Sequence, residues 1–101
     1  MIIYNITCKV DWSVHEEWLA WVQQKYMPDM LSIDLFYHGQ LVRLLETDET
    51  DGPTYALQFY THSLENYQHF MTGAGTALLR RQLDHWNNAV VSFGTVMQQV
   101  G

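Results

Sequence analysis

The sequence predicts an α+β domain with the element order β-α-β-β-α-β and a four-stranded antiparallel sheet. Segments near both ends of the chain alternate along the backbone with the period of two that is typical of strands. Two intervening segments carry apolar residues at helical spacing. With 101 residues, the chain has room for one hydrophobic core, so we expect a single domain over residues 1–101.

The first strand and the first helix follow directly from the N-terminal sequence. The stretch IIYNITCKVD places one apolar set on one face of a strand: Ile2, Tyr4, Ile6, Cys8 and Val10. Ser13 and Glu16 have the spacing of a capping box, which predicts a helix start. Because Pro28 lacks an amide proton and restricts its predecessor, we expect this helix to stop or kink near Met27.

The middle of the chain predicts a hairpin. We expect a connector to about Tyr37, a strand over residues 40–46 and an acidic turn that Gly52 helps to close. The stretch TYALQFYTH then predicts a third strand with one apolar face formed by Tyr55, Leu57 and Phe59.

The second helical region is predicted to be broken by glycines. Ser63 is expected to cap a short helix, and the GAG stretch at 73–75 is expected to end it. A further helix would start at Thr76 and stack Leu79, Leu83 and Trp86. The last strand spans 89–100, with Ala89, Val91, Phe93 and Met97 assigned to one face.

This order is the ferredoxin-like split βαβ arrangement, in which right-handed crossovers put both helices on one face of the sheet. The other face would then carry Ile3, Asn5, Thr7, Lys9, Ala56, Gln58, Tyr60, Val90, Ser92 and Val96. Such a mixed face is typical of an interface, so we predict a homodimer with sheet packed against sheet. Polar side chains between the sheets could line a small cavity, with these ligand-binding candidates: Asn5, Thr7, Gln58, Tyr60, His62 and Ser92.

Charge and composition exclude several classes of function. The formal net charge is −6 with only five Lys and Arg, so no basic face is expected and nucleic acid is not predicted as a partner. No apolar run reaches the roughly 20 residues of a membrane span, and the first residues do not resemble a signal peptide. A single cysteine fits a reducing compartment, and we expect a cytoplasmic protein.

The candidate chemistry is sparse. The five histidines form no HExxH or H-x-x-x-H pair, and ETDETDG does not have the spacing of an EF-hand loop, so no metal site is predicted. GAGT lacks the preceding strand and the lysine of a phosphate-binding loop. Cys8 lies on the apolar face of its strand and is expected to be inert. His69 is expected to seat a helix, and no cofactor is predicted.

Taken whole, the chain resembles a family of small bacterial proteins of unknown function with a dimeric α/β-barrel, ferredoxin-like fold. The resemblance covers nearly all positions and is carried by MIIYNITCKVDWSVHEEWLAWVQQKYMPDML, RLLETDETDGPTYALQFY, ENYQHF and LDHWNNAVVSFGTVMQ. The wider superfamily includes cofactor-independent monooxygenases and haem-degrading enzymes. By that resemblance Asn5 and His69 are candidate catalytic residues, although TYALQFY lacks the tryptophan of the haem-degrading members.

Two hypotheses of function follow. The first is a non-catalytic homodimeric domain that binds a small molecule or a protein between its sheets, and the lack of a complete catalytic motif favours it. The second is a barrel-type enzyme, a cofactor-independent monooxygenase or isomerase, using Asn5, Tyr60, His62 or His69. An enzyme would need a base and a donor that converge in a closed pocket, so the two hypotheses differ in their geometry.

Overall fold

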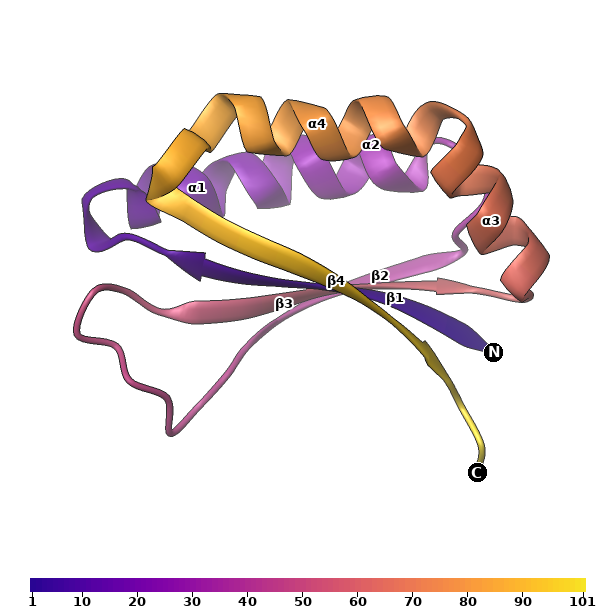
Figure 1. The fold of residues 1–101 in the computed structure, drawn as a ribbon, viewed down its shortest axis with the longest axis horizontal. Coiled ribbons are helices and arrows are strands. Elements are labelled where there is room, and N and C mark those ends of the chain that lie inside the picture. The colour runs from indigo at the N-terminus through magenta and orange to yellow at the C-terminus, as the bar shows by residue number, and fades with distance from the viewer.

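The computed structural model describes residues 1–101 and shows a four-stranded antiparallel sheet with all helices on one side (Figure 1). The sheet order is β2-β3-β1-β4, and the strands are β1 Ile2–Val10, β2 His38–Arg43, β3 Thr54–Thr61 and β4 Val90–Gln98. The helices are α1 His15–Trp21, α2 Met27–Leu31, α3 Leu64–Thr72 and α4 Ala74–Trp86. The predicted fold class, an α+β ferredoxin-like domain with a broken second helix, is confirmed.

The central strand β1 sets the register of the whole sheet. It pairs antiparallel with β3 on one side and β4 on the other, so that Asn5 stands opposite both Gln58 and Thr95. Because successive side chains of a strand point to opposite faces, the even-numbered residues of β1 face the helices. All five of them are buried: Ile2, Tyr4, Ile6, Cys8 and Val10. The predicted faces of β1 and β3 are therefore confirmed.

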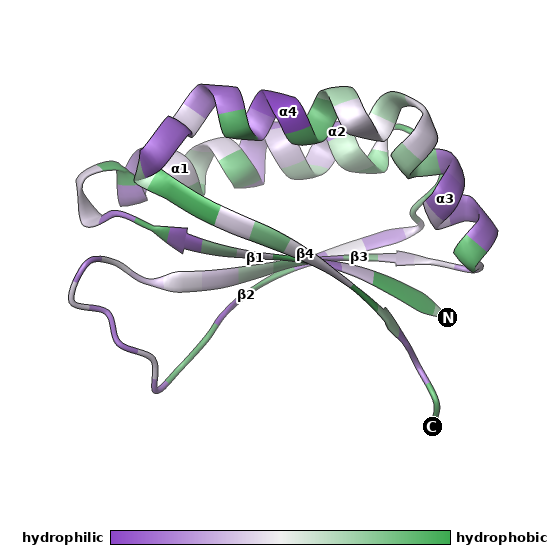
Figure 2. Cartoon of the chain, viewed as in Figure 1, coloured by the Kyte–Doolittle hydropathy of each residue, from purple (hydrophilic) through white to green (hydrophobic).

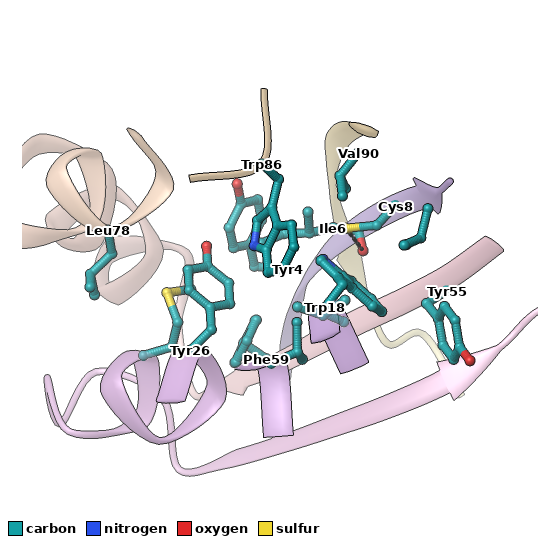
Figure 3. Close-up of a cluster of buried hydrophobic side chains, with 14 of the residues drawn as sticks. Tyr4, Ile6, Cys8, Trp18, Tyr26, Tyr55, Phe59, Leu78, Trp86 and Val90 are labelled. Atoms are coloured by element: carbon teal, nitrogen blue, oxygen red, sulfur yellow. Dashed lines mark hydrogen bonds between the residues drawn. The ribbon is translucent and has the colours of Figure 1, made fainter. Parts of the chain in front are cut away.

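The hydrophobic core lies between this face of the sheet and the helices. Aromatic side chains from both strands and helices fill it, and Trp18, Tyr26 and Phe59 are completely buried (Figure 3). The helices present only one side to the core, which is why α4 appears banded in green and purple in Figure 2. The core holds the helix layer on one face and leaves the other face of the sheet without cover.

The predicted faces of β4 are wrong. The register places Val90, Ser92 and Val96 beside Val10, Cys8 and Tyr4 of β1, which is the helix side of the sheet. The residues assigned to the core, Val91, Phe93 and Met97, point instead to the opposite side. Apolar residues occupy both parities of VVSFGTVMQ, so alternation alone could not decide which parity faces the helices.

Of the two outcomes predicted near Met27, a stop or a kink of the first helix, the stop is wrong. The helix continues through a π-helical segment, Val22–Tyr26, into α2, and the Met27 amide donates to the carbonyl oxygen of Val22 five residues earlier. The wider π turn accommodates the missing amide and the bulky ring of Pro28 without ending the helix. This continuation buries Met30 and extends the cover over the sheet.

Of the two predicted helix N-caps, Ser13 and Ser63, the structure confirms only Ser63. Ser13 does not cap the first helical region, because the Asp11 carboxylate accepts from the Ser13 amide at 2.8 Å and starts a short 3-10 turn over Trp12–Val14. The predicted cap at Ser63 is confirmed, since its hydroxyl accepts from the Asn66 amide at 3.1 Å. Asp and Ser are both strong N-caps, so their order at the first turn could not be decided from spacing.

The break in the second helix is also confirmed, but its buried side differs from the prediction. Gly73 separates α3 from α4, and α4 already begins at Ala74. At Gly75 an added Cβ would lie 2.3 Å from the carbonyl oxygen of Phe70, so only glycine fits this corner. As a result α4 buries Leu78, Gln82 and Trp86, whereas Leu83 is 54% exposed.

The β2–β3 hairpin is offset from the prediction by about two residues. β2 covers residues 38–43 rather than 40–46, and Glu46 has a positive φ of 58°, which turns the chain out of the sheet. The connecting loop returns to β1, where Gly52 lies so close to the Val10 carbonyl that a Cβ would clash. The acidic loop is thus fixed beside the end of β1.

Candidate functional site

The side of the sheet turned away from the helices is the candidate site, and we call it the open face. In Figure 1 no helix lies on this side. The open face comprises fifteen strand residues: Ile3, Asn5, Thr7, Lys9, His38, Gln40, Val42, Thr54, Ala56, Gln58, Tyr60, Val91, Phe93, Thr95 and Met97. It contains no carboxylate, and none of the eleven Asp and Glu residues of the chain lies in any of the four strands.

A row of hydrogen-bonded polar side chains crosses the middle of the open face. Tyr60 Oη donates to Gln58 Oε1 at 3.5 Å, Gln58 Nε2 donates to Asn5 Oδ1 at 3.2 Å, and Asn5 Nδ2 donates to Thr7 Oγ1 at 3.0 Å. We call these four residues the polar row. Asn5 is buried although no helix covers it, because its neighbours on both flanking strands surround it. The hydrogen bonds of the polar row thus fix the orientation of the Asn5 and Gln58 amide groups on a surface that no helix covers.

Apolar side chains lie beside the polar row toward the β4 edge. Val91 is 66% exposed and Phe93 is 63% exposed, and both stand on the open face. Full burial of a side chain of this type contributes roughly 1.5–3 kcal/mol, so leaving both in water is unfavourable. This part of the open face is therefore suited to contact with another apolar surface.

Aromatic and histidine rings gather at the opposite corner of the open face. The His38 and Tyr60 ring centroids are 5.2 Å apart, and His62 stacks on Tyr37 at 4.3 Å with an interplanar angle of 18°. His62 lies just beyond the end of β3 and is exposed. These rings could bind a planar group, and no carboxylate lies among them.

The predicted site residues separate into three groups. Asn5, Thr7, Gln58 and Tyr60 come together as the polar row, whereas His62 lies at the corner of the same face. Ser92 is on the helix side of the sheet, because the register places it opposite Cys8. The open-face assignment of Ser92 is therefore wrong.

The two residues suggested as catalytic, Asn5 and His69, do not meet. Asn5 points to the open face, whereas His69 belongs to α3, which packs on the other side of the sheet (Figure 1). His69 is also exposed and its ring makes no hydrogen bond, so it does not seat the helix as predicted. Within one protomer the pair cannot act on a common substrate.

The buried ionisable groups lie on the helix side and stay neutral. Burial, with smaller contributions from Tyr67 and Cys8, raises the pKa of Tyr4 to about 12. Burial also raises the pKa of the Cys8 thiol to about 12, although the hydrogen bond from Gln82 opposes this, and burial raises the pKa of Tyr26. A protonated, fully buried thiol is a poor nucleophile, in agreement with the prediction that Cys8 is inert.

One pair of residues was missed by sequence reasoning. His15 Nε2 lies 2.7 Å from Tyr55 Oη, and the Arg43 guanidinium lies 5.9 Å from the centre of the Tyr55 ring. Arg43 in turn forms a bidentate ion pair with Glu49. His15 and Tyr55 are forty positions apart, so no local pattern could have joined them. No group of three or more His, Cys, Asp or Glu side chains is arranged to hold a metal ion.

The chain belongs to the family described as Domain of unknown function (DUF4286), which matches residues 1–100. None of the curated proteins matches it. No helix in the structure combines the length and apolar character needed to cross a membrane.

Solved structures with the same fold share little sequence with this chain. An ethyl tert-butyl ether d (ethd) family protein from Bacillus halodurans has a TM-score of 0.72 at 12% identity, with 99% of this chain and 100% of that chain covered. A monooxygenase from Streptomyces coelicolor in complex with the ligand nanaomycin D has a TM-score of 0.68 at 14% identity, with 99% and 88% covered. A dimeric ferredoxin-like protein from an uncultured marine organism has a TM-score of 0.67 at 7% identity, with 99% and 95% covered. At these identities the likeness shows the fold alone.

Proposed function

We propose that the protein is a non-catalytic binding domain that forms a homodimer by packing the open face of one protomer against that of another. The observation that carries the proposal is an uncovered sheet face that exposes Phe93 and Val91 and contains no carboxylate. The solved dimeric ferredoxin-like protein shows that a chain with this fold can pair with its own copy. We expect the pair to act in the cytoplasm of a bacterium.

The charge distribution favours a second copy as the occupant. Across a two-fold axis each surface meets itself, so any net charge near the axis would repel its equivalent. The chain carries a net charge of −6, yet its only fully charged residue on the open face is Lys9, which is at the end of β1. The strands of two copies can therefore meet there without bringing strand carboxylates together.

The polar row gives such an interface its specificity and a possible binding function. Amide groups of Asn5 and Gln58 have hydrogen-bonding capacity beyond the bonds they make within the row. In a dimer this capacity must be met by the partner, by water or by a small molecule, because unpaired buried amides are costly. We expect a small polar ligand or ordered water to lie between the two rows.

The enzyme alternative has less support from the residues. Catalysis of a proton transfer needs a base within hydrogen-bond reach of the substrate, and the polar row holds only amides and hydroxyls. His38 is the nearest histidine, and its ring centre lies 5.2 Å from that of Tyr60. A monooxygenase or isomerase activity would rest on the fold likeness alone, which is why we place binding first.

The test is the mass in solution by light scattering at micromolar concentration. The wild-type chain should give twice the 11.9 kDa of one protomer, about 24 kDa, since association of this kind is governed by mass action. Phe93→Asp should give the protomer mass, because it places a carboxylate on the open face. Leu64→Asp is the matched control, because Leu64 is 48% exposed and lies in α3, on the other side of the sheet (Figure 1). A wild-type protomer mass, or dissociation by the control alone, would contradict the proposal.

A further inference from the structure

The helix side of the sheet contains a small pocket, and Phe93 is the one lining residue that belongs to the open face. Its volume is about 150 Å³, and its walls come from α4, β1 and the middle of β4. Six lining side chains are on the helix side, three of them aliphatic and three with a polar group: Ile6, Leu79 and Leu83, and Tyr4, Gln82 and Ser92. Leu79 and Leu83 were expected in the core, and their place at this pocket accounts for the exposure of Leu83.

The polar groups of the pocket have hydrogen-bonding capacity left. Tyr4 is 5% exposed and Gln82 is 3% exposed. Gln82 Nε2 donates to Cys8 Sγ at 3.4 Å, and neither Gln82 Oε1 nor the hydroxyls of Tyr4 and Ser92 have a hydrogen-bond partner in the chain. A few polar groups on a partly apolar wall are typical of a ligand pocket, and a polar atom of a ligand could pair with these groups.

Gly94 forms part of the pocket wall and keeps it open. An added Cβ there would lie 3.0 Å from both the Tyr4 hydroxyl oxygen and its ring. Glycine in the interior of a strand often marks close approach of another group, and here that group is the Tyr4 ring. The absence of a side chain at residue 94 leaves space beside the Tyr4 hydroxyl.

We propose that this pocket binds a single-ring phenol or a similarly sized aromatic compound with one hydroxyl group. An apolar cavity of about 150 Å³ is the size that accepts a benzene ring. The ring would contact Ile6, Leu79 and Leu83. Its hydroxyl would accept from Tyr4 or Ser92 and donate to Gln82 Oε1. Tyr4 remains protonated near neutral pH because its pKa is raised to about 12, so it can donate.

The inference does not require the dimer. All residues of the pocket belong to one protomer, and their polar groups lie on the helix side of the sheet. A failure of the phenol site would leave the proposed pairing of open faces unaffected. Equally, a monomeric protein that binds phenol in this pocket would support the inference and contradict the dimer.

The experiment is a titration of the 15N-labelled full chain with phenol, and separately with toluene, followed by amide chemical shifts. For so small a ligand we expect a Kd of about 1 mM for phenol. The shifts should centre on residues 78–83 and 92–94. Toluene should bind about five- to ten-fold more weakly, since it lacks the hydroxyl that the three polar groups recognise.

Three variants sharpen the test. Tyr4→Phe should weaken phenol binding about five-fold and leave toluene binding unchanged, because it removes one hydrogen bond and no ring. Gly94→Ala should weaken both ligands, because its methyl group reduces the space beside Tyr4. Tyr26→Phe is the matched control, since it removes the hydroxyl of another core tyrosine that does not line the pocket.

The inference would be overturned by any of three results. The first is the absence of saturable shifts up to about 20 mM phenol, well above the expected Kd. The second is a set of shifts confined to the open face. The third is a Tyr4→Phe variant that binds phenol as tightly as the wild type while Tyr26→Phe does not.

Discussion

The two faces of the sheet are built from the same strands but do different work. On the helix side, β1 and β3 present large apolar and aromatic residues such as Ile6, Leu57 and Phe59, all of them buried. On the open face the alternate residues of the same strands are Asn5, Thr7 and Gln58, which bond to one another. Because the side chains of a strand alternate, a single stretch of sequence can specify both a core and an interface.

The two faces also contribute to different properties: the helix side to the stability of the protomer, and the open face to association. Side chains of the helix side hold the protomer together, because each removes its apolar surface from water within the chain. Side chains of the open face are bonded mainly to each other and contribute little to holding the helices. A substitution on one face should therefore change folding, and a substitution on the other should change association.

The largest expected effect is on the helix side. Phe59→Ala should lower the free energy of unfolding of the protomer by about 3–5 kcal/mol, because Phe59 is fully buried and leaves a cavity. Urea denaturation followed by circular dichroism measures this. Tyr37→Ala is a control, since Tyr37 is 50% exposed and its loss should cost much less. An equal loss of unfolding free energy for the two substitutions would contradict the claim that the covered side of the sheet provides the stability of the protomer.

The next effect is on association. Asn5→Asp keeps the shape of the side chain but adds a carboxylate at the centre of the open face, where two copies would meet. Like charges placed across an interface cost several kcal/mol, so the dimer Kd should rise by at least about 100-fold at neutral pH. Sedimentation velocity over a concentration series measures the change.

A matched substitution makes that test specific. Asn88→Asp is the same chemical change at an exposed position beyond the end of α4, and we expect the dimer Kd to remain within about two-fold of wild type. If both variants dissociate equally, net charge rather than the open face would control association.

A smaller effect concerns pH. The pKa of Cys8 is raised from 9.0 to about 12 in the folded chain, so the unfolded chain loses this proton first as pH rises. The stabilising contribution is complete below pH 9 and is lost as pH rises toward about 12. At pH 10 the loss is about 1.4 kcal/mol, since pH 10 is one unit above the unfolded pKa and one pKa unit corresponds to about 1.4 kcal/mol. Urea unfolding of wild type and Cys8→Ala at pH 8 and pH 10 should show a smaller decrease for the variant; equal decreases would contradict the assignment.

The smallest effect tests how the helix layer is held on its side of the sheet. Ser63→Ala should cost about 1 kcal/mol of unfolding free energy, because Ser63 caps α3 through the Asn66 amide. Ser13→Ala should cost less than about 0.5 kcal/mol, because Asp11 and not Ser13 accepts the capping bond. If chemical denaturation showed a larger loss of unfolding free energy for Ser13→Ala than for Ser63→Ala, the predicted capping box at Ser13 would be supported instead.

The residues of the open face could be predicted only in strands where polar and apolar residues alternate. β1 alternates Ile6 and Cys8 with Asn5 and Thr7, so its faces were assigned correctly, and with them most of the polar row. β4 has apolar residues at both parities, such as Val90 and Val91, and only its pairing with β1 decides which face each residue takes. Ser92 was therefore placed on the wrong side of the sheet.

The helix-side pocket had no sequence signal of its own. The spacing of Leu79, Leu83 and Trp86 predicted their stack, whereas Gln82 interrupts the apolar pattern of α4 and a buried glutamine is unusual. The partner of Gln82 is Cys8, which is seventy-four positions away. Likewise, the continuation of the first helix past Pro28 depends on a π turn that local propensities do not predict.

The most direct test of the account is an isotope-filtered nuclear Overhauser experiment on an equal mixture of 13C-labelled and unlabelled protein. If open faces pair, contacts between protomers should arise from the side chains of Ile3, Val42 and Met97 and should exclude those of α4. Contacts that arise from Leu79 or Leu83 instead, or no contacts between protomers at all, would contradict the central claim.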